Sequence, residues 1–247
     1  MLQDPYEVEV NPYFRSWGVE GTALGLTSRR FEGERAGRRF VTLLSPRRRT
    51  RYAGDIRTTH YQGHTVDIAV SVSPRTRFVA ALAENANRFS RYLNRRSGVH
   101  PVPLPAGLEH LEIWAAEPDW AARWLAVEGV GERIARLLAP DARSRMRNVA
   151  LSPLDGLSYK VSRIHLRTLT GDDLHGWLAD LYALAAAVDS VEPPRAMLEP
   201  TWMEKKAKES PWLLAVGVLA ALFAVVAAAG LLFTGALVGL AYLLSKH

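Results

Sequence analysis

The sequence predicts an α+β soluble domain of antiparallel strands, several short helices and a long final helix, followed by one C-terminal transmembrane helix. Polar and apolar residues alternate early in the chain, and apolar residues recur at helical spacing after Thr170. The 33 residues from Trp212 to Leu244 include no charged residue. The expected parts are an irregular N-terminal arm (1–20), a cytoplasmic α+β domain (21–192), a linker (193–211) and a transmembrane helix (212–244).

The first half of the domain is expected to be a strand meander. Its segments are enriched in Val, Ile, Thr and Tyr, and glycines and prolines separate them, which is typical of antiparallel strands. A further short strand and a basic helix complete this half. The predicted strands are 22–30, 38–45, 49–59, 65–73 and 77–83, and the predicted helix is 85–96.

The second half mixes strands and helices. A proline-rich link at 100–105 is expected to be extended, because each proline restricts the residue before it. Strands are then expected at 108–115, 147–152 and 158–168, and short helices at 118–127 and 132–138. Thr170 and Asp173 have the spacing of a capping box, so the longest soluble helix is expected to begin there and to end before Pro193.

The chain contains no cysteine, which excludes disulfides, thiolate catalysis and cysteine-bound zinc or iron–sulfur centres. The first five residues have neither a basic start nor an apolar run, so no secretory signal is expected.

The net charge of +6 is unevenly distributed. Residues 29–96 contain sixteen arginines and five acidic residues. Many of these arginines fall at predicted strand ends and turns, so they are expected to form a basic surface. The residues assigned to that surface are Arg38, Arg39, Arg47, Arg48, Arg49 and Arg51.

Four interpretations of the basic surface remain open. Anionic lipid attracts such a surface by about 1 kcal/mol per basic residue. An acidic protein surface is a second partner, and a solvated face without any partner is the third interpretation. Nucleic acid is the fourth, but the sequence has no recognition-helix, zinc-finger or RNA-binding signature, which disfavours it.

Candidate catalytic and metal sites are few. His60, His64 and Asp67 are the one cluster of potential metal ligands, although histidines beside a turn are usually exposed to solvent. Glu109 and His110 are neighbours on a predicted strand and therefore face opposite ways. No GxSxG, P-loop or HExxH motif is present. We therefore expect no catalytic residue, no cofactor, no bound metal and no enzymatic activity.

The apolar C-terminal segment is long enough for one membrane crossing. A helix of 212–244 would measure about 50 Å, against a hydrocarbon core of about 30 Å, so it is expected to tilt or to extend beyond the core. A re-entrant hairpin broken at Gly230 is the alternative. The expected interfacial anchors are Trp202, Trp212, Tyr242, Lys205, Lys206 and Lys208.

The flanking charges and the small residues predict orientation and packing. Three lysines precede the segment and one follows it, which favours a single-pass protein of the inner (cytoplasmic) membrane with its N-terminus in the cytoplasm, inserted as a tail anchor. Small residues allow close approach of a second helix, from another transmembrane subunit or from a second copy. The residues expected to pack there are Gly235, Gly239, Ala220, Ala224 and Ala228.

These observations predict a membrane-anchored accessory or scaffolding subunit of a membrane protein complex. The alternative is a membrane-surface lipid-binding or sensor module that uses the arginine-rich face. An enzyme whose site has no recognisable motif is the third possibility, which a pocket with convergent polar groups would favour.

Overall fold

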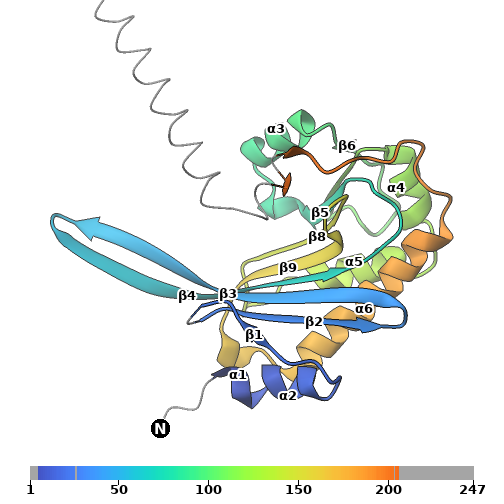
Figure 1. Cartoon of the computed structure of the whole chain (residues 1–247). Coiled ribbons are helices and arrows are strands. Elements are labelled where there is room, and N and C mark those ends of the chain that lie inside the picture. Colours follow the sequence, from blue (N-terminus) through green and yellow to red (C-terminus); the bar gives the residue numbers. More distant parts are fainter. Residues whose placement is uncertain (1–4, 26, 203, 206–247) are drawn as a thin grey trace, which may run out of the picture. The chain divides into compact units, whose positions relative to one another are not determined.

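The computed structural model describes residues 5–25, 27–202 and 204–205. The chain divides into two compact units, Met1–Glu199 and Pro200–His247. The first unit is an α+β domain with a long final helix, and the strands of its described residues form one nine-stranded antiparallel sheet (Figure 1). The predicted class of the soluble domain is therefore confirmed.

The strands do not follow chain order across the sheet. The order is β1-β2-β3-β4-β9-β8-β5-β7-β6, so the chain leaves the sheet after β4 and its last two strands return between β4 and β5. The bounds are β1 (Thr22–Ala23), β2 (Arg29–Arg35), β3 (Arg38–Ala53), β4 (Ile56–Val70), β5 (Phe78–Leu82), β6 (His100–Pro101), β7 (Leu111–Ala115), β8 (Met146–Ser152) and β9 (Gly156–Ile164).

The helices include two that the sequence analysis did not predict. Residues 5–15, expected to be irregular, form α1 and α2, and their buried Tyr6, Val10 and Phe14 join the core. The bounds are α1 (Pro5–Val8), α2 (Val10–Arg15), α3 (Arg88–Arg96), α4 (Pro118–Leu125), α5 (Val130–Leu138) and α6 (Gly171–Ser190), with 3₁₀ turns η1 at Ala83–Asn85 and η2 at Leu166–Thr168.

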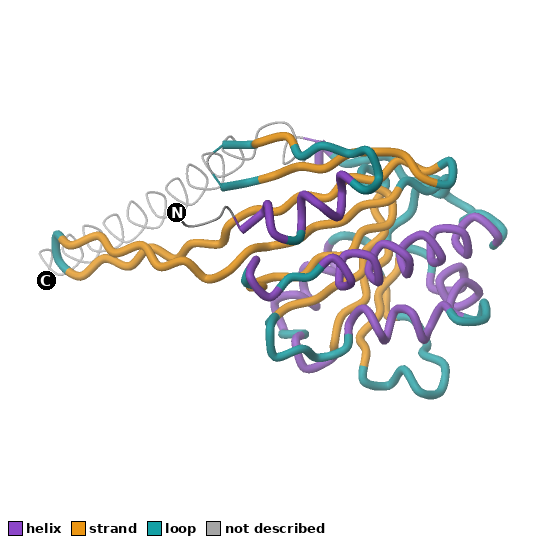
Figure 2. Tube along the Cα trace, turned by 90° about the horizontal axis from the view of Figure 1, so that it is seen from below, coloured by secondary structure: helices purple, strands orange, loops and turns teal. Residues whose placement is uncertain are grey.

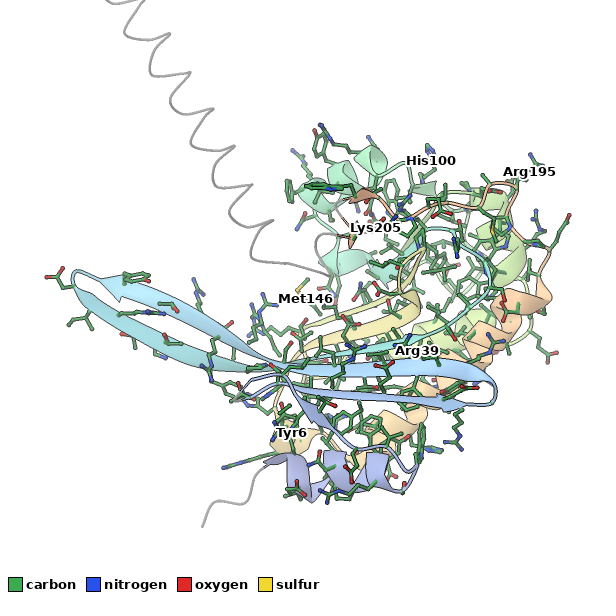
Figure 3. All side chains as sticks on the ribbon, viewed as in Figure 1. Tyr6, Arg39, His100, Met146, Arg195 and Lys205 are labelled. Atoms are coloured by element: carbon green, nitrogen blue, oxygen red, sulfur yellow. The ribbon has the colours of Figure 1, made fainter. Side chains whose placement is uncertain are left out.

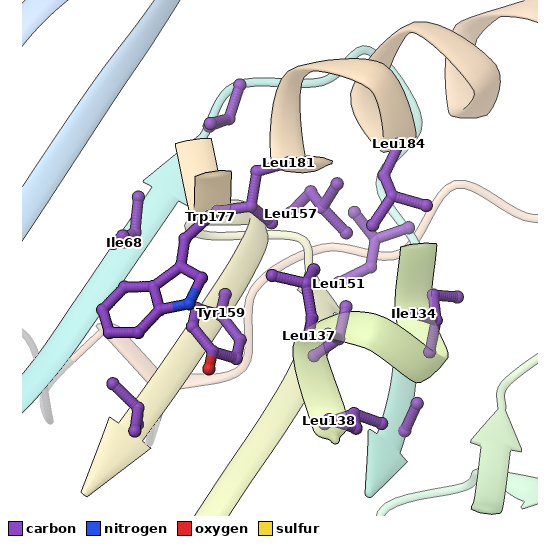
Figure 4. Close-up of a cluster of buried hydrophobic side chains, with 14 of the residues drawn as sticks. Ile68, Ile134, Leu137, Leu138, Leu151, Leu157, Tyr159, Trp177, Leu181 and Leu184 are labelled. Carbon is purple, nitrogen blue, oxygen red and sulfur yellow. The ribbon is translucent and has the colours of Figure 1, made fainter. Parts of the chain in front are cut away.

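One face of the sheet is covered by a layer that includes α1, α2, α5 and α6, as the view from below shows (Figure 2). Alternate residues of β4 and β9 point into this layer, because successive side chains of a strand face opposite ways. Figure 4 shows the central contacts, where Ile68 and Tyr159 of the sheet meet Trp177 of α6 and Leu137 of α5.

Helix α6 begins where its sequence predicts. The Thr170 side chain accepts a hydrogen bond from the backbone N–H of Asp173, and the Asp173 carboxylate accepts one from the backbone N–H of Thr170. This is a capping box, which satisfies N–H groups that have no partner inside the helix.

The predicted strands 22–30 and 49–59 are both wrong in one respect, because the chain reverses inside each of them. Gly54 and Asp55 form a two-residue hairpin loop, and only Gly54 (φ +59°) has a positive φ, as a type II′ turn requires. Strand β3 also continues past Pro46, where we expected it to end. Pro46 is tolerated because it sits at a register shift in the ladder.

The segment after α6, at the end of the first unit, is hydrogen-bonded to the rest of the domain. The backbone N–H groups of Arg195 and Ala196 donate to the Glu117 carboxylate, and that of Leu198 donates to the carbonyl of Arg75. Of the helices in the part of the chain that the structure describes, none is both long and apolar enough for a membrane crossing. The predicted transmembrane segment, 212–244, lies outside the described residues.

Candidate functional site

The β3–β4 hairpin is much longer than the sheet that holds it. Strand β2 pairs with β3 only as far as Leu44, and β9 pairs with β4 only from His64 onward. Within the described part of the chain, residues 47–61 therefore pair only with each other, and we call them the ribbon. Figures 1 and 2 both show the ribbon extending away from the rest of the domain.

Two adjacent β-bulges mark the point where the ribbon leaves the sheet. The β3–β4 register shifts next to Gly63 (φ +89°), and the β4–β9 register shifts at Arg163 (φ +65°). A bulge bends its strand and increases its twist. The two bulges together account for the departure of the ribbon from the plane of the sheet.

The ribbon has a high positive charge. It contains five arginines and one acidic residue, Asp55, and no ion pair joins any of these arginines to another described residue. The five are Arg47, Arg48, Arg49, Arg51 and Arg57. Figure 3 shows the side chains of the ribbon projecting away from the body of the domain. A partner of opposite charge would therefore reach them without displacing a protein group.

Both faces of the ribbon are cationic, and each face has one exposed apolar side chain near the tip. Arg48 and Arg57 lie on one face with Tyr52, while Arg49 and Arg51 lie on the other with Ile56, as the cross-strand pairs indicate. Tyr52 is 72% exposed and Ile56 is 69% exposed. Exposed apolar side chains among guanidinium groups suit a partner surface that is both charged and partly apolar.

The base of the ribbon is fixed by aromatic contacts. The Tyr61 hydroxyl hydrogen-bonds Nδ1 of His64, and the Tyr61 ring meets the His165 ring edge-on at 5.5 Å between centroids. His64 is only 5% exposed, and its burial lowers its pKa from 6.5 to about 4. A neutral His64 therefore anchors the ribbon at neutral pH.

A cavity of about 290 Å³ lies beside this base. Its lining combines cationic side chains with amide and hydroxyl groups, and it comes from β4, from the end of β9, from η2 and from the loop before β8. The lining residues are Gln62, Ala142, Arg143, Ser144, Arg145, Arg163, His165 and Thr168.

The predicted basic surface is divided between two places. Arg38 forms a 2.5 Å ion pair with Asp189 of α6, and Arg39 forms an ion pair with Glu32 of β2. Both lie at the start of β3, whereas Arg47, Arg48, Arg49 and Arg51 lie in the ribbon toward its other end. Charge density in the sequence indicated all six, but only the last four are free of ion pairs within the described residues.

The candidate metal and acid–base residues do not converge. His60 is exposed on the ribbon, His64 is buried, and Asp67 lies 3.5 Å from the ammonium of Lys160. Across the described ranges, no group of three or more His, Asp or Glu side chains is placed to hold a metal ion. Glu109 and His110 lie in the turn before β7 and not on a strand, and the Glu109 carboxylate accepts hydrogen bonds from the backbone N–H of Gly107.

The residues predicted to contact the membrane fall mostly outside the described part of the chain. Trp202 and Lys205 are described and exposed. Thr201 and Glu204 exchange capping hydrogen bonds, which is typical of a helix start. The residues outside the described ranges are Lys206, Lys208, Trp212, Ala220, Ala224, Ala228, Gly235, Gly239 and Tyr242.

Sequence reasoning did not single out Arg57, Arg145 or Arg163. The sequence contains a local signal for Arg57, because a hairpin turn at Gly54-Asp55 places this residue opposite Tyr52. Arg145 and Arg163 had none, since their neighbourhood depends on how β8 and β9 return to the sheet.

No family model and no curated protein matches the sequence. Among solved structures, the chain is similar in fold to the crystal structure of the mycobacterial trehalose monomycolate transport factor A, TtfA. The TM-score is 0.44 and the sequence identity is 8%, over 75% of this chain and 96% of that chain. Similarity at this level carries no statement about function.

Proposed function

We propose that the protein is a membrane-anchored accessory protein whose soluble domain binds an anionic lipid surface through the ribbon. The ribbon is the observation that carries this proposal. Five arginines that form no ion pair with another described residue lie near the exposed apolar side chains of Tyr52 and Ile56, on a hairpin whose residues 47–61 pair with no other described strand.

Lipid chemistry suits both parts of the ribbon. Each arginine near an anionic headgroup layer contributes about 1 kcal/mol, so the five together would contribute about 5 kcal/mol if they acted independently. Aromatic and aliphatic side chains such as Tyr52 and Ile56 favour the boundary between headgroups and acyl chains. The predicted transmembrane segment would hold the ribbon near this surface at high effective concentration.

A cationic ribbon also fits a nucleic-acid groove, which makes nucleic acid the competing partner. Phosphate backbones would explain the arginines, but they give no role to the exposed Tyr52 and Ile56 on the two faces near the tip. The predicted membrane anchor also favours lipid.

The absence of cysteine allows a clean labelling experiment. Thr58 is exposed on the ribbon beside Arg51, so Thr58→Cys would carry an environment-sensitive fluorophore without removing a charge or a tip residue. The full chain would be reconstituted into nanodiscs of phosphatidylcholine alone or of phosphatidylcholine mixed with phosphatidylglycerol. We expect a blue shift in emission only in the anionic discs, and its loss at high salt.

Two controls make the result specific. Ala106→Cys, exposed on the turn between β6 and β7, should report the same environment in both discs. Replacing Arg48, Arg51 and Arg57 with Gln should remove the shift at residue 58, whereas the exposed Arg123→Gln on α4 should preserve it. Equal emission in neutral and anionic discs would contradict the proposal. A shift caused by duplex DNA instead of lipid would identify nucleic acid as the partner.

The small residues of the predicted transmembrane segment favour a second role, as a subunit of a membrane protein complex. Gly235 and Gly239 are spaced as in helices that pack closely in lipid. Lipid binding by the ribbon and helix packing in the bilayer are compatible, because they use different parts of the chain.

A further inference from the structure

We infer that the cavity at the base of the ribbon is a binding site for a phosphate group. The cavity is formed by the body of the domain, outside residues 47–61. The inference therefore does not depend on lipid binding by the ribbon.

The charge around the cavity is only partly neutralised. Arg143 donates hydrogen bonds to Asp141 and Asp173, and Arg147 donates to the same Asp141. These two carboxylates are therefore already occupied by Arg143 and Arg147.

Arg145 and Arg163 line the cavity without an ion pair to any described residue. His165 also lines the cavity, and its imidazole ring adds a hydrogen-bonding group beside the two arginines. The cavity therefore has an excess of positive charge that an anion would neutralise.

The placement of Arg163 is unusual. It is the extra residue of the β9 bulge and has a φ of +65°. This backbone conformation is strained for residues other than Gly, Asn or Asp. Its Nε atom is buried and has no hydrogen-bond partner among the described residues. Because Nε itself is closed to solvent, an anion in the cavity would bind the terminal nitrogens of this guanidinium group. Strained residues of this kind often belong to binding sites.

Phosphate matches the geometry and the size. Guanidinium groups bind phosphate oxygens through pairs of parallel N–H bonds, and the neutral side chains of Gln62 and Ser144 add donors. A volume of about 290 Å³ lies at the small end for ligand sites, which start at about 300 Å³. The cavity therefore suits a phosphate with a short attached group, either free phosphate or the phosphate of a lipid headgroup.

Inorganic phosphate is the first probe. The detergent-solubilised full chain would be titrated into phosphate and followed by ³¹P NMR line broadening. We expect saturable binding that Arg145→Gln and Arg163→Asn each weaken about 10-fold or more, as for loss of a charged hydrogen bond. Asparagine is chosen at residue 163 because it tolerates positive φ. The matched control Arg123→Gln, exposed on α4, should bind like the unmodified chain.

The second probe distinguishes the two sources of phosphate. A short-chain phosphatidylglycerol that displaces phosphate at about 10-fold lower concentration than phosphate itself would identify a lipid headgroup, and equal or weaker displacement would identify free phosphate. No saturable binding, or binding that survives Arg145→Gln in protein with unchanged circular dichroism, would overturn the inference. Gln substitutions at Arg48, Arg51 and Arg57 should leave phosphate binding intact. The phosphate site and lipid binding by the ribbon are therefore tested independently of each other.

Discussion

Gly63 of β4 lies directly against the backbone of Arg163 of β9. A Cβ atom at residue 63 would be 2.8 Å from the carbonyl carbon of Arg163, which is closer than real Cβ atoms approach. Both residues have positive φ and both lie at bulges. This contact therefore connects the base of the ribbon with the wall of the phosphate cavity.

Gly63→Ala should destabilise the domain by about 2–4 kcal/mol, because it adds strain at φ +89° to a clash with fixed backbone atoms. Urea unfolding of residues 1–199 would measure this loss. The control is Gly37→Ala at the β2–β3 turn, which has similar strain (φ +72°) but nothing within 4 Å of the added Cβ. Equal losses at the two positions would show that the close contact has no energetic importance.

The Asp180 carboxylate connects α5 to α6. Its side chain is 8% exposed, and it accepts hydrogen bonds from Arg136 at 2.6 and 2.9 Å and from Arg133 at 2.9 Å. Asp180→Asn should cost about 1–2 kcal/mol of stability, because the released guanidinium groups remain hydrated.

Removing both arginines (Arg133→Gln with Arg136→Gln) should cost more, about 3 kcal/mol, because a buried carboxylate loses its compensating charge. The denaturant midpoints of the unmodified protein, Asp180→Asn and the double arginine variant would give their order of stability. A double arginine variant more stable than Asp180→Asn would contradict this account.

The stability of the domain should decrease in acid through His64. Burial, with smaller effects from His165 and Arg48, lowers the pKa of His64 from 6.5 to about 4, so the unfolded chain takes up a proton more readily than the folded one. The contribution of neutral His64 to the free energy of unfolding is therefore complete above about pH 6.5. As the pH falls to about 4, this free energy decreases by about 3 kcal/mol.

Unfolding free energies at about pH 7 and about pH 4.5 would show the loss, and His64→Gln should reduce the difference between them. Carboxylates also titrate in this range, so the comparison between the two proteins isolates His64. An identical pH dependence in both would exclude the role of His64.

The small residues of the predicted transmembrane segment should mediate association. Gly235→Ile with Gly239→Ile would prevent close helix approach, so we expect weaker association with a second copy or with a membrane partner in a detergent pull-down. Leu231→Ile with Leu232→Ile is the control, because it adds no bulk. Unchanged association in the glycine variant would mean that the segment does not pack through these residues.

The sequence by itself determined features that depend on local order. Alternation predicted the strands at 38–45 and 65–73, because side-chain direction repeats every two residues, but it missed the reversals inside 22–30 and 49–59. Thr170 and Asp173 predicted the start of α6, because a cap needs only residues three apart. The concentration of arginines between 29 and 96 was also visible without a structure.

Only the tertiary structure decided which arginines are available to a partner. Arg38 is neutralised by Asp189, about 150 residues away in the chain, and no local pattern predicts such a contact. The cavity exists because β9 returns beside β4 and brings Arg163 next to Gln62. Long-range strand pairing follows from burial of the whole core, which a single segment of sequence does not encode.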